Sequence, residues 1–165
     1  MKYVAIFLML LVSCGFWNPA NAANVTTFYF VDVGHGNATF VVAPTGEVVL
    51  LDCGPTRAAD RIVSFARQNG IQKVDYLIVS HFEDDHMGAA PKLSEAIPIL
   101  NWVDHGETVT DRKSDDWWAA RRTLARGRPR PGVGKMNDDR WDTFRAAREK
   151  QGNHIVVKAG DRVPV

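Results

Sequence analysis

The chain has 165 residues, of which 20 are Lys or Arg and 19 are Asp or Glu, so its formal net charge at pH 7 is +1. This near balance argues against a global electrostatic field that would recruit nucleic acid or an anionic membrane. Residues 23–165, which remain after a predicted leader, are an ordinary size for one domain with its own hydrophobic core.

Residues 1–22 have the pattern of an export signal peptide. Lys2 supplies a positive charge, an apolar run follows, and Ala20-Asn21-Ala22 fits the small-x-small cleavage pattern. The apolar run is too short and too often interrupted to favour a membrane span. A second interpretation is that Leu11-Val12-Ser13-Cys14 resembles a bacterial lipoprotein box, in which Cys14 becomes lipidated. Both interpretations predict an exported protein, periplasmic or extracellular.

Three strands are predicted at the start of the remaining chain. Residues 25–33 are rich in Val, Thr, Phe and Tyr, and residues 38–43 and 48–51 form two further apolar runs around a Pro/Gly turn. Asp52 ends the third strand, where a carboxylate often caps a turn. The adjacent Cys53 has no disulfide partner, because the other cysteine lies in the leader, and such a thiol is either buried or a neighbour of a metal site.

The middle of the chain alternates between strand and helix patterns. Residues 57–68 carry apolar side chains at helical spacing and are followed by a glycine stop. An apolar strand at 76–79, a short helix at 91–96 and another strand at 97–103 continue the pattern. The order predicts an α/β fold, with a mixed sheet and helices on its faces.

The stretch directly after the strand at 76–79 is unusually rich in side chains that can bind a metal. Four potential metal ligands follow within six residues: His81, Glu83, Asp85 and His86. Imidazole and carboxylate groups together suit zinc, and also iron or manganese. In an extended loop His81 and Glu83 project the same way and share one ion, while Asp85 and His86 turn towards a second. The alternative is a solvated turn, and the preceding strand and following small residues favour the metal site.

A family resemblance rests on these residues and on two earlier segments. His81-x-Glu83-x-Asp85-His86 resembles the His-x-His-x-Asp-His signature of the metallo-β-lactamase superfamily. Residues 30–40, with Val33-Gly34-His35-Gly36-Asn37, look like the opening strand and Val-Gly-Gln-Gly-Asp turn of secreted domains similar to the competence protein ComEC. Residues 48–54 look like the strand that ends in the family's Asp-x-Gly. The segments occur in the family's order and cover about residues 25–90.

The resemblance implies an αββα sandwich, in which two sheets pack face to face with helices outside. The implied ligands of one or two zinc ions are His81, Glu83, Asp85 and His86. Asp85 would also orient the attacking water and accept its proton, which makes it the implied catalytic residue. Asp52 would orient a metal-bound histidine through a hydrogen bond, and His35 would line the site.

Two departures from the family pattern limit how far the resemblance extends. Glu83 stands where the superfamily usually has His, and the sequence reaches Val165 without a match for the family's further His, bridging Asp and last His. We therefore expect residues 23–165 to form only the N-terminal part of the domain, the first half plus an insertion, with one apolar sheet face uncovered. The later histidines, His105 and His154, are either structural or substitute ligands.

The predicted insertion covers residues 107–152. Helical patterns at 116–125 and 138–151 flank a basic, Pro/Gly-rich loop at 126–134, and a strand at 154–159 follows. The basic loop and nearby tryptophans either contact a phosphodiester strand through charge and stacking or form a solvated surface loop. By the resemblance, this insertion would be a substrate-selecting flap over the metal site.

Three functions remain open on sequence grounds. The first is an exported metal-dependent hydrolase that uses a metal-activated water on an ester or phosphodiester substrate. The second is an inactive remnant or a non-catalytic metal-binding scaffold. The third is a nucleic-acid-binding module that uses the basic loop. The resemblance favours the first and tilts the substrate towards a phosphodiester or nucleic acid.

Overall fold

The structure is a computed structural model that describes residues 24–106 and 133–163, with side chains from Arg140 onwards in the second range. In these ranges, six strands form one sheet in the order β1-β2-β3-β4-β5-β6. The strands are β1 (Thr27–Phe30), β2 (Thr39–Val42), β3 (Val48–Leu51), β4 (Val74–Ile78), β5 (Ile99–Asp104) and β6 (Asn153–Val156). The pairs β1–β2 and β2–β3 are antiparallel, and the later pairs are parallel, so the sheet is mixed as predicted.

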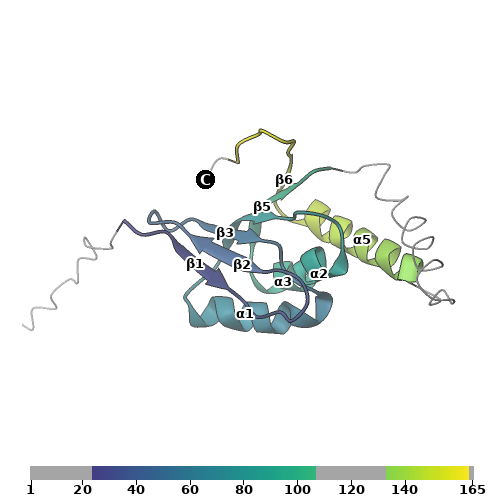
Figure 1. Cartoon of the computed structure of the whole chain (residues 1–165), viewed down its shortest axis with the longest axis horizontal. Coiled ribbons are helices and arrows are strands. Elements are labelled where there is room, and N and C mark those ends of the chain that lie inside the picture. Colours follow the sequence, from purple (N-terminus) through teal and green to yellow (C-terminus); the bar gives the residue numbers. More distant parts are fainter. Residues whose placement is uncertain (1–23, 107–132, 164–165) are drawn as a thin grey trace, which may run out of the picture.

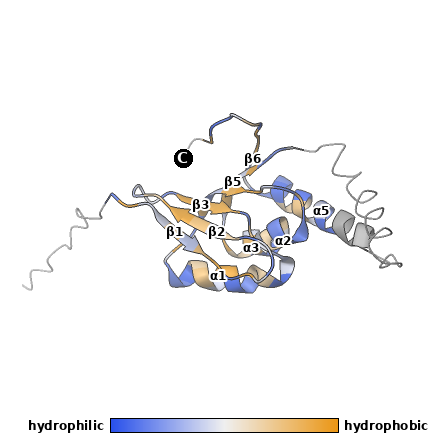
Figure 2. Ribbon diagram, viewed as in Figure 1, coloured by the Kyte–Doolittle hydropathy of each residue, from blue (hydrophilic) through white to orange (hydrophobic). Residues whose placement is uncertain are grey.

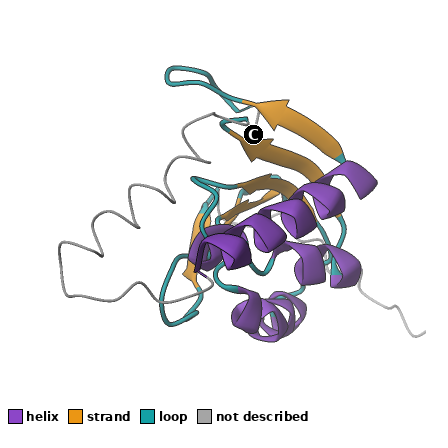
Figure 3. Cartoon of the chain, turned by 90° about the vertical axis from the view of Figure 1, so that its right-hand side faces the viewer, coloured by secondary structure: helices purple, strands orange, loops and turns teal. Residues whose placement is uncertain are grey.

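The described helices gather on one side of the sheet (Figures 1 and 3). They are η1 (Thr56–Ala58), α1 (Ala59–Gln68), α2 (Asp84–Met87), α3 (Ala90–Ala96) and α5 (Val133–Lys150). The helix α3 contacts both α1 and α5, so the three longest described helices form one layer. The prediction of an α/β fold is confirmed, but the described helices cover one face of the sheet rather than both.

The hydrophobic core lies between this helix layer and the sheet. Strand register aligns Phe40 with Leu50, Leu50 with Leu77 and Leu77 with Trp102, and all four side chains are buried. The helices contribute Ile62, Leu93 and Phe144, which are buried too. Figure 2 shows the matching hydropathy, with apolar strands and helices whose colours alternate between hydrophilic and hydrophobic. Alternation along each strand therefore places one apolar row against the helices.

The opposite face of the sheet also carries apolar side chains. Phe28 and Phe30 alternate with the half-buried Tyr29 along β1 and are 57% and 79% exposed. Tyr29 pairs with Phe40 of the helix-facing row, so the two exposed phenylalanines point the other way. Phe28 and Phe30 are thus exposed apolar side chains on this face, and the expectation that a whole sheet face is left uncovered stays a prediction.

The predicted elements agree with the described structure except at their ends and at one short helix, α2, that the sequence does not predict. The predicted strand at 25–33 is shorter, and the helix predicted at 138–151 begins at Val133. Residues 84–87, predicted as part of a loop, form the short helix α2, because Glu83 is extended and Asp84 starts a helical turn. The predicted helix at 116–125 lies outside the described residues.

Helix α5 fills the later part of the predicted insertion and packs against the core through Phe144. Whether residues 107–132 form a flap stays a prediction, as does the leader, because both segments lie outside the described residues. Among the helices that the structure describes, none has the length and hydrophobicity needed to cross a membrane.

Candidate metal centre

The predicted site residues lie at the edge of the sheet where the parallel strands β3, β4 and β5 end. Asp52 follows β3, the segment from His81 to His86 follows β4, and Asp104 ends β5. Parallel strands point their carboxyl ends the same way, so three segments distant in sequence converge here, as in other open α/β sheets.

Asp52 is the buried hydrogen-bonding centre of this edge. Its Oδ1 accepts the backbone N–H of Ser80 at 2.8 Å, and its Oδ2 accepts the Ser80 hydroxyl at 3.0 Å and lies 2.8 Å from His86 Nδ1. Its backbone φ of +54° is left-handed, a region that Asp tolerates better than most residues. A donating Nδ1–H on His86 leaves the Nε2 lone pair free on the other side of the ring.

The four predicted ligands form two neighbouring pairs. His81 Nε2 lies 3.8 Å from Glu83 Oε2, and His86 Nε2 lies 3.6 Å from Asp85 Oδ2. The rings of His81 and His86 have centroids 4.0 Å apart, so the pairs are in contact. The structure thus brings His81 beside Glu83 and Asp85 beside His86, with Asp85 and His86 on α2 rather than on an extended loop. That each pair holds an ion stays a prediction.

His35 reaches the same cluster from the loop between β1 and β2. Its Nε2 lies 3.1 Å from Asp85 Oδ2, while 85% of its side chain is exposed. Asp85 therefore lies between the imidazoles of His35 and His86. The structure thus places His35 beside the predicted ligands, where the resemblance expects a site-lining residue.

The donor set has the chemistry of a site for zinc or a similar divalent ion. Imidazole nitrogens and carboxylate oxygens are its usual ligands, and Asp52 holds His86 as metal-ligating histidines are commonly held. Across residues 24–106 and 133–163, however, no group of three or more His, Cys, Asp or Glu donors converges closely enough to hold an ion as it stands. The residues fit a metal in kind, and side-chain rearrangement would be needed to close a three-donor set.

Hydrogen bonds from Cys53 hold residues 81–86, here called the ligand segment, against the end of β3. Cys53 N–H donates to the His86 carbonyl at 2.7 Å, and its thiol donates to the same oxygen at 3.3 Å. Burial raises the pKa of the Cys53 thiol far above its ordinary value, and the charge of Asp52 adds to the rise. Burial and this hydrogen bond favour the interpretation of Cys53 as a buried structural thiol.

Helix α5 supports the ligand segment in a way that the sequence does not reveal. Phe82 packs at a tilt against Trp141, with ring centroids 4.2 Å apart, and against the His105 ring at 4.6 Å. Arg140 forms an ion pair with Asp84, whose carboxylate also accepts the Thr56 hydroxyl at 2.8 Å. The apolar spacing on α5 predicts an amphipathic helix but not the surface that it covers.

The two later histidines have structural partners. His105 stacks on Phe82, and His154 Nε2 lies 3.0 Å from Asp104 Oδ1. The buried Asp104 also forms an ion pair with Arg148 at 2.7 Å. In this arrangement neither histidine is bonded to the predicted ligands, so the interpretation of both as structural residues is favoured.

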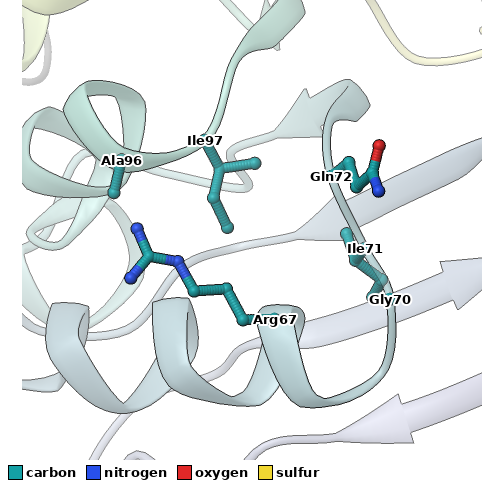
Figure 4. A pocket seen from close by; sticks show the side chains of 6 residues that line it. All are labelled: Arg67, Gly70, Ile71, Gln72, Ala96 and Ile97. Carbon is teal, nitrogen blue, oxygen red and sulfur yellow. The ribbon is translucent and has the colours of Figure 1, made fainter.

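A surface cavity of about 340 Å³ lies at the opposite end of β4 (Figure 4). Its lining residues are Arg67, Gly70, Ile71, Gln72, Ala96 and Ile97. The segment at 70–72 precedes β4, whereas the ligand segment follows it, so this cavity is separate from the ligand cluster.

A sequence model of the family described as the metallo-beta-lactamase superfamily matches residues 31–160, which include the loop after β1, the ligand segment and strand β6. No curated protein matches the chain.

Proposed function

Because the chain belongs to the metallo-beta-lactamase superfamily, a membership that points to metallohydrolase-type chemistry, we propose that it is an exported, metal-dependent hydrolase. Zinc is the proposed metal, and an ester or phosphodiester, including nucleic acid, is the proposed substrate. The observation that carries the proposal is the contact of His86 with both the orienting Asp52 and the neighbouring Asp85.

The proposed roles follow from the geometry of the chain's own side chains. His81, Glu83, Asp85 and His86 would hold the metal, which as a Lewis acid would allow water to act as a nucleophile near neutral pH. Asp52 keeps the proton of His86 on Nδ1, so that Nε2 faces Asp85 as a free donor atom. Asp85 would hold the attacking water through a hydrogen bond and accept its proton, because its side chain is a carboxylate that still reaches solvent.

Asp85→Ala should reduce metal-dependent hydrolysis by about 10²–10⁴-fold, the usual contribution of a positioned acid or base. The measurement is the release of nitrophenol from bis-nitrophenyl phosphate and from a nitrophenyl ester, with and without added zinc. Asp60→Ala is the matched control, because Asp60 is exposed on α1 and pairs with Lys92. Equal zinc-dependent rates in the wild type and Asp85→Ala would contradict the proposed role.

Asp52→Asn should weaken zinc binding by about 10–100-fold, the usual effect of losing a partner that orients a ligand. An amide in place of the carboxylate donates through its NH₂ to His86 Nδ1, which moves the imidazole proton to Nε2 and blocks the donor atom. Competition with a zinc-binding dye measures the affinity. Thermal unfolding of the metal-free proteins checks that the variant folds, and unchanged zinc affinity would overturn the role assigned to Asp52.

One observation favours a second candidate function, a non-catalytic metal-binding domain. The predicted ligands stand as two pairs rather than as a closed three-donor group among the described residues. Tight zinc binding with no zinc-dependent turnover in the nitrophenyl assays would select this candidate over the hydrolase.

A further inference from the structure

We infer that His35 is itself a metal ligand and forms, with Asp85 and His86, a three-donor set at the carboxyl edge of the sheet. The inference rests on the proposed function, because it concerns the same metal centre. It goes further by assigning a ligand from outside the segment 81–86 that carries the other predicted donors.

The first argument is the position of one carboxylate oxygen. Asp85 Oδ2 lies 3.1 Å from His35 Nε2 and 3.6 Å from His86 Nε2. A single acceptor atom is thus flanked by two imidazole nitrogens from different loops. Two nitrogens and one carboxylate oxygen are a usual ligand set of a divalent zinc site that leaves one position open.

The second argument is that the backbone holds the loop of His35 against Asp85. Asn37 N–H donates to the Asp85 carbonyl at 3.3 Å, and the Asn37 carbonyl accepts the Gly54 N–H at 2.8 Å. Gly36 has a φ of +106°, and a Cβ at this position would overlap the Asp85 carbonyl oxygen. Only glycine permits both this conformation and this approach, so the loop places its neighbour His35 over the carboxylate.

The same loop is linked to the residue that orients His86. The Asn37 side-chain amide donates to the Leu51 carbonyl at 3.0 Å and to Asp52 Oδ2 at 3.3 Å. Asp52 Oδ2 is also the partner of His86 Nδ1. One connected set of hydrogen bonds around Asp85 therefore holds both the backbone of the His35 loop and the ring of His86.

The third argument is the freedom that remains to the imidazole. The His35 side chain is 85% exposed, and a contact made by so exposed a side chain contributes little to stability. The contact with Asp85 therefore does little to hold the His35 imidazole in place, and the ring can rotate at little cost in energy.

A thiol placed at position 35 tests the inference directly. In the full-length His35→Cys variant loaded with cobalt(II), a thiolate ligand would produce a near-ultraviolet charge-transfer absorption that imidazole does not. The wild type controls for Cys14 and Cys53, and Thr45→Cys controls for an exposed thiol on the turn between β2 and β3, which the structure leaves solvent-exposed. His35→Ala should weaken cobalt binding at least roughly tenfold, as expected for loss of a metal-site partner.

The outcomes separate this inference from the proposed function. A charge-transfer band in His35→Cys alone, with weaker binding in His35→Ala, would support His35 as a ligand. No band and unchanged affinity, in proteins whose wild type binds cobalt, would overturn the inference and leave the proposed metal centre standing. A folded wild type that binds no cobalt would overturn both.

Discussion

Asp104→Ala should lower the free energy of unfolding by about 3–5 kcal/mol, the usual cost of breaking a buried ion pair by removing one partner. Asp104 is fully buried, and its Oδ2 accepts a hydrogen bond from Arg148 at 2.7 Å. Its Oδ1 accepts the Gly106 N–H at 2.8 Å and lies 3.0 Å from His154 Nε2. Alanine would leave the nearly buried Arg148 guanidinium without its carboxylate.

Urea denaturation followed by tryptophan fluorescence measures the change in unfolding free energy. Asp142→Ala is the matched control, because Asp142 pairs with Arg145 on the exposed side of α5, the helix that also carries Arg148. Substitutions at the surface usually change the free energy of unfolding by less than about 0.5 kcal/mol. The double variant Asp104→Ala/Arg148→Met should recover part of the loss, since it removes both charges. A change below about 1 kcal/mol in Asp104→Ala would show that the ion pair is not buried in solution.

The effect would reach beyond local stability, because Arg148 joins α5 to β5 at the edge that carries the proposed metal centre. Its guanidinium pairs with Asp104 of β5 and lies 5.6 Å and 5.8 Å from the ring centroids of Trp141 and Phe144 on α5. Trp141 in turn packs on Phe82 within the ligand segment. Loss of Asp104 would therefore loosen the helix that supports the ligands.

Much of the fold follows from sequence patterns alone. Apolar runs and glycine stops place β3, β4, α1 and α3 within one or two residues of their observed bounds, because each element buries one face against the same core. The alternation of strand and helix predicts the parallel pairs β3–β4 and β4–β5. Parallel strands then explain why Asp52 and the ligand segment share one edge.

The contacts within the site could be predicted only in part. The pairing of His81 with Glu83 follows from spacing, and the contact of Asp52 with His86 follows only from the family resemblance. The contact between His35 and Asp85 depends on a close backbone approach at Gly36. Sequence periodicity carries no information about such an approach, because it arises when two distant loops pack together.

The support of the ligand segment by α5 could not be predicted for a similar reason. Helical spacing identifies Trp141 and Phe144 as one apolar face, but many surfaces of the sheet edge would accept that face. The choice depends on Phe82, which follows the predicted ligand His81 directly, and on the ion pair of Arg140 with Asp84. These are tertiary contacts between segments more than fifty residues apart.

The double variant His81→Ala/His86→Ala should lose metal binding entirely, which is the largest effect expected on function. It removes one imidazole from each of the two ligand pairs, and each pair would keep only a carboxylate. The two carboxylates and the single imidazole of His35 that would remain bind zinc far more weakly than sets that include two or more histidines. His105→Ala is the matched control, because this histidine stacks on Phe82 instead of joining the ligands.

The measurement that tests the metal centre most directly is the zinc content of the purified chain. The protein is prepared without a metal-binding tag, incubated with zinc, dialysed and analysed for zinc per chain. The account predicts about one or two tightly held ions in the wild type and in His105→Ala, and none in the double variant. A folded wild type without zinc, or a double variant that retains it, would contradict the assignment of the segment from His81 to His86 as a metal site.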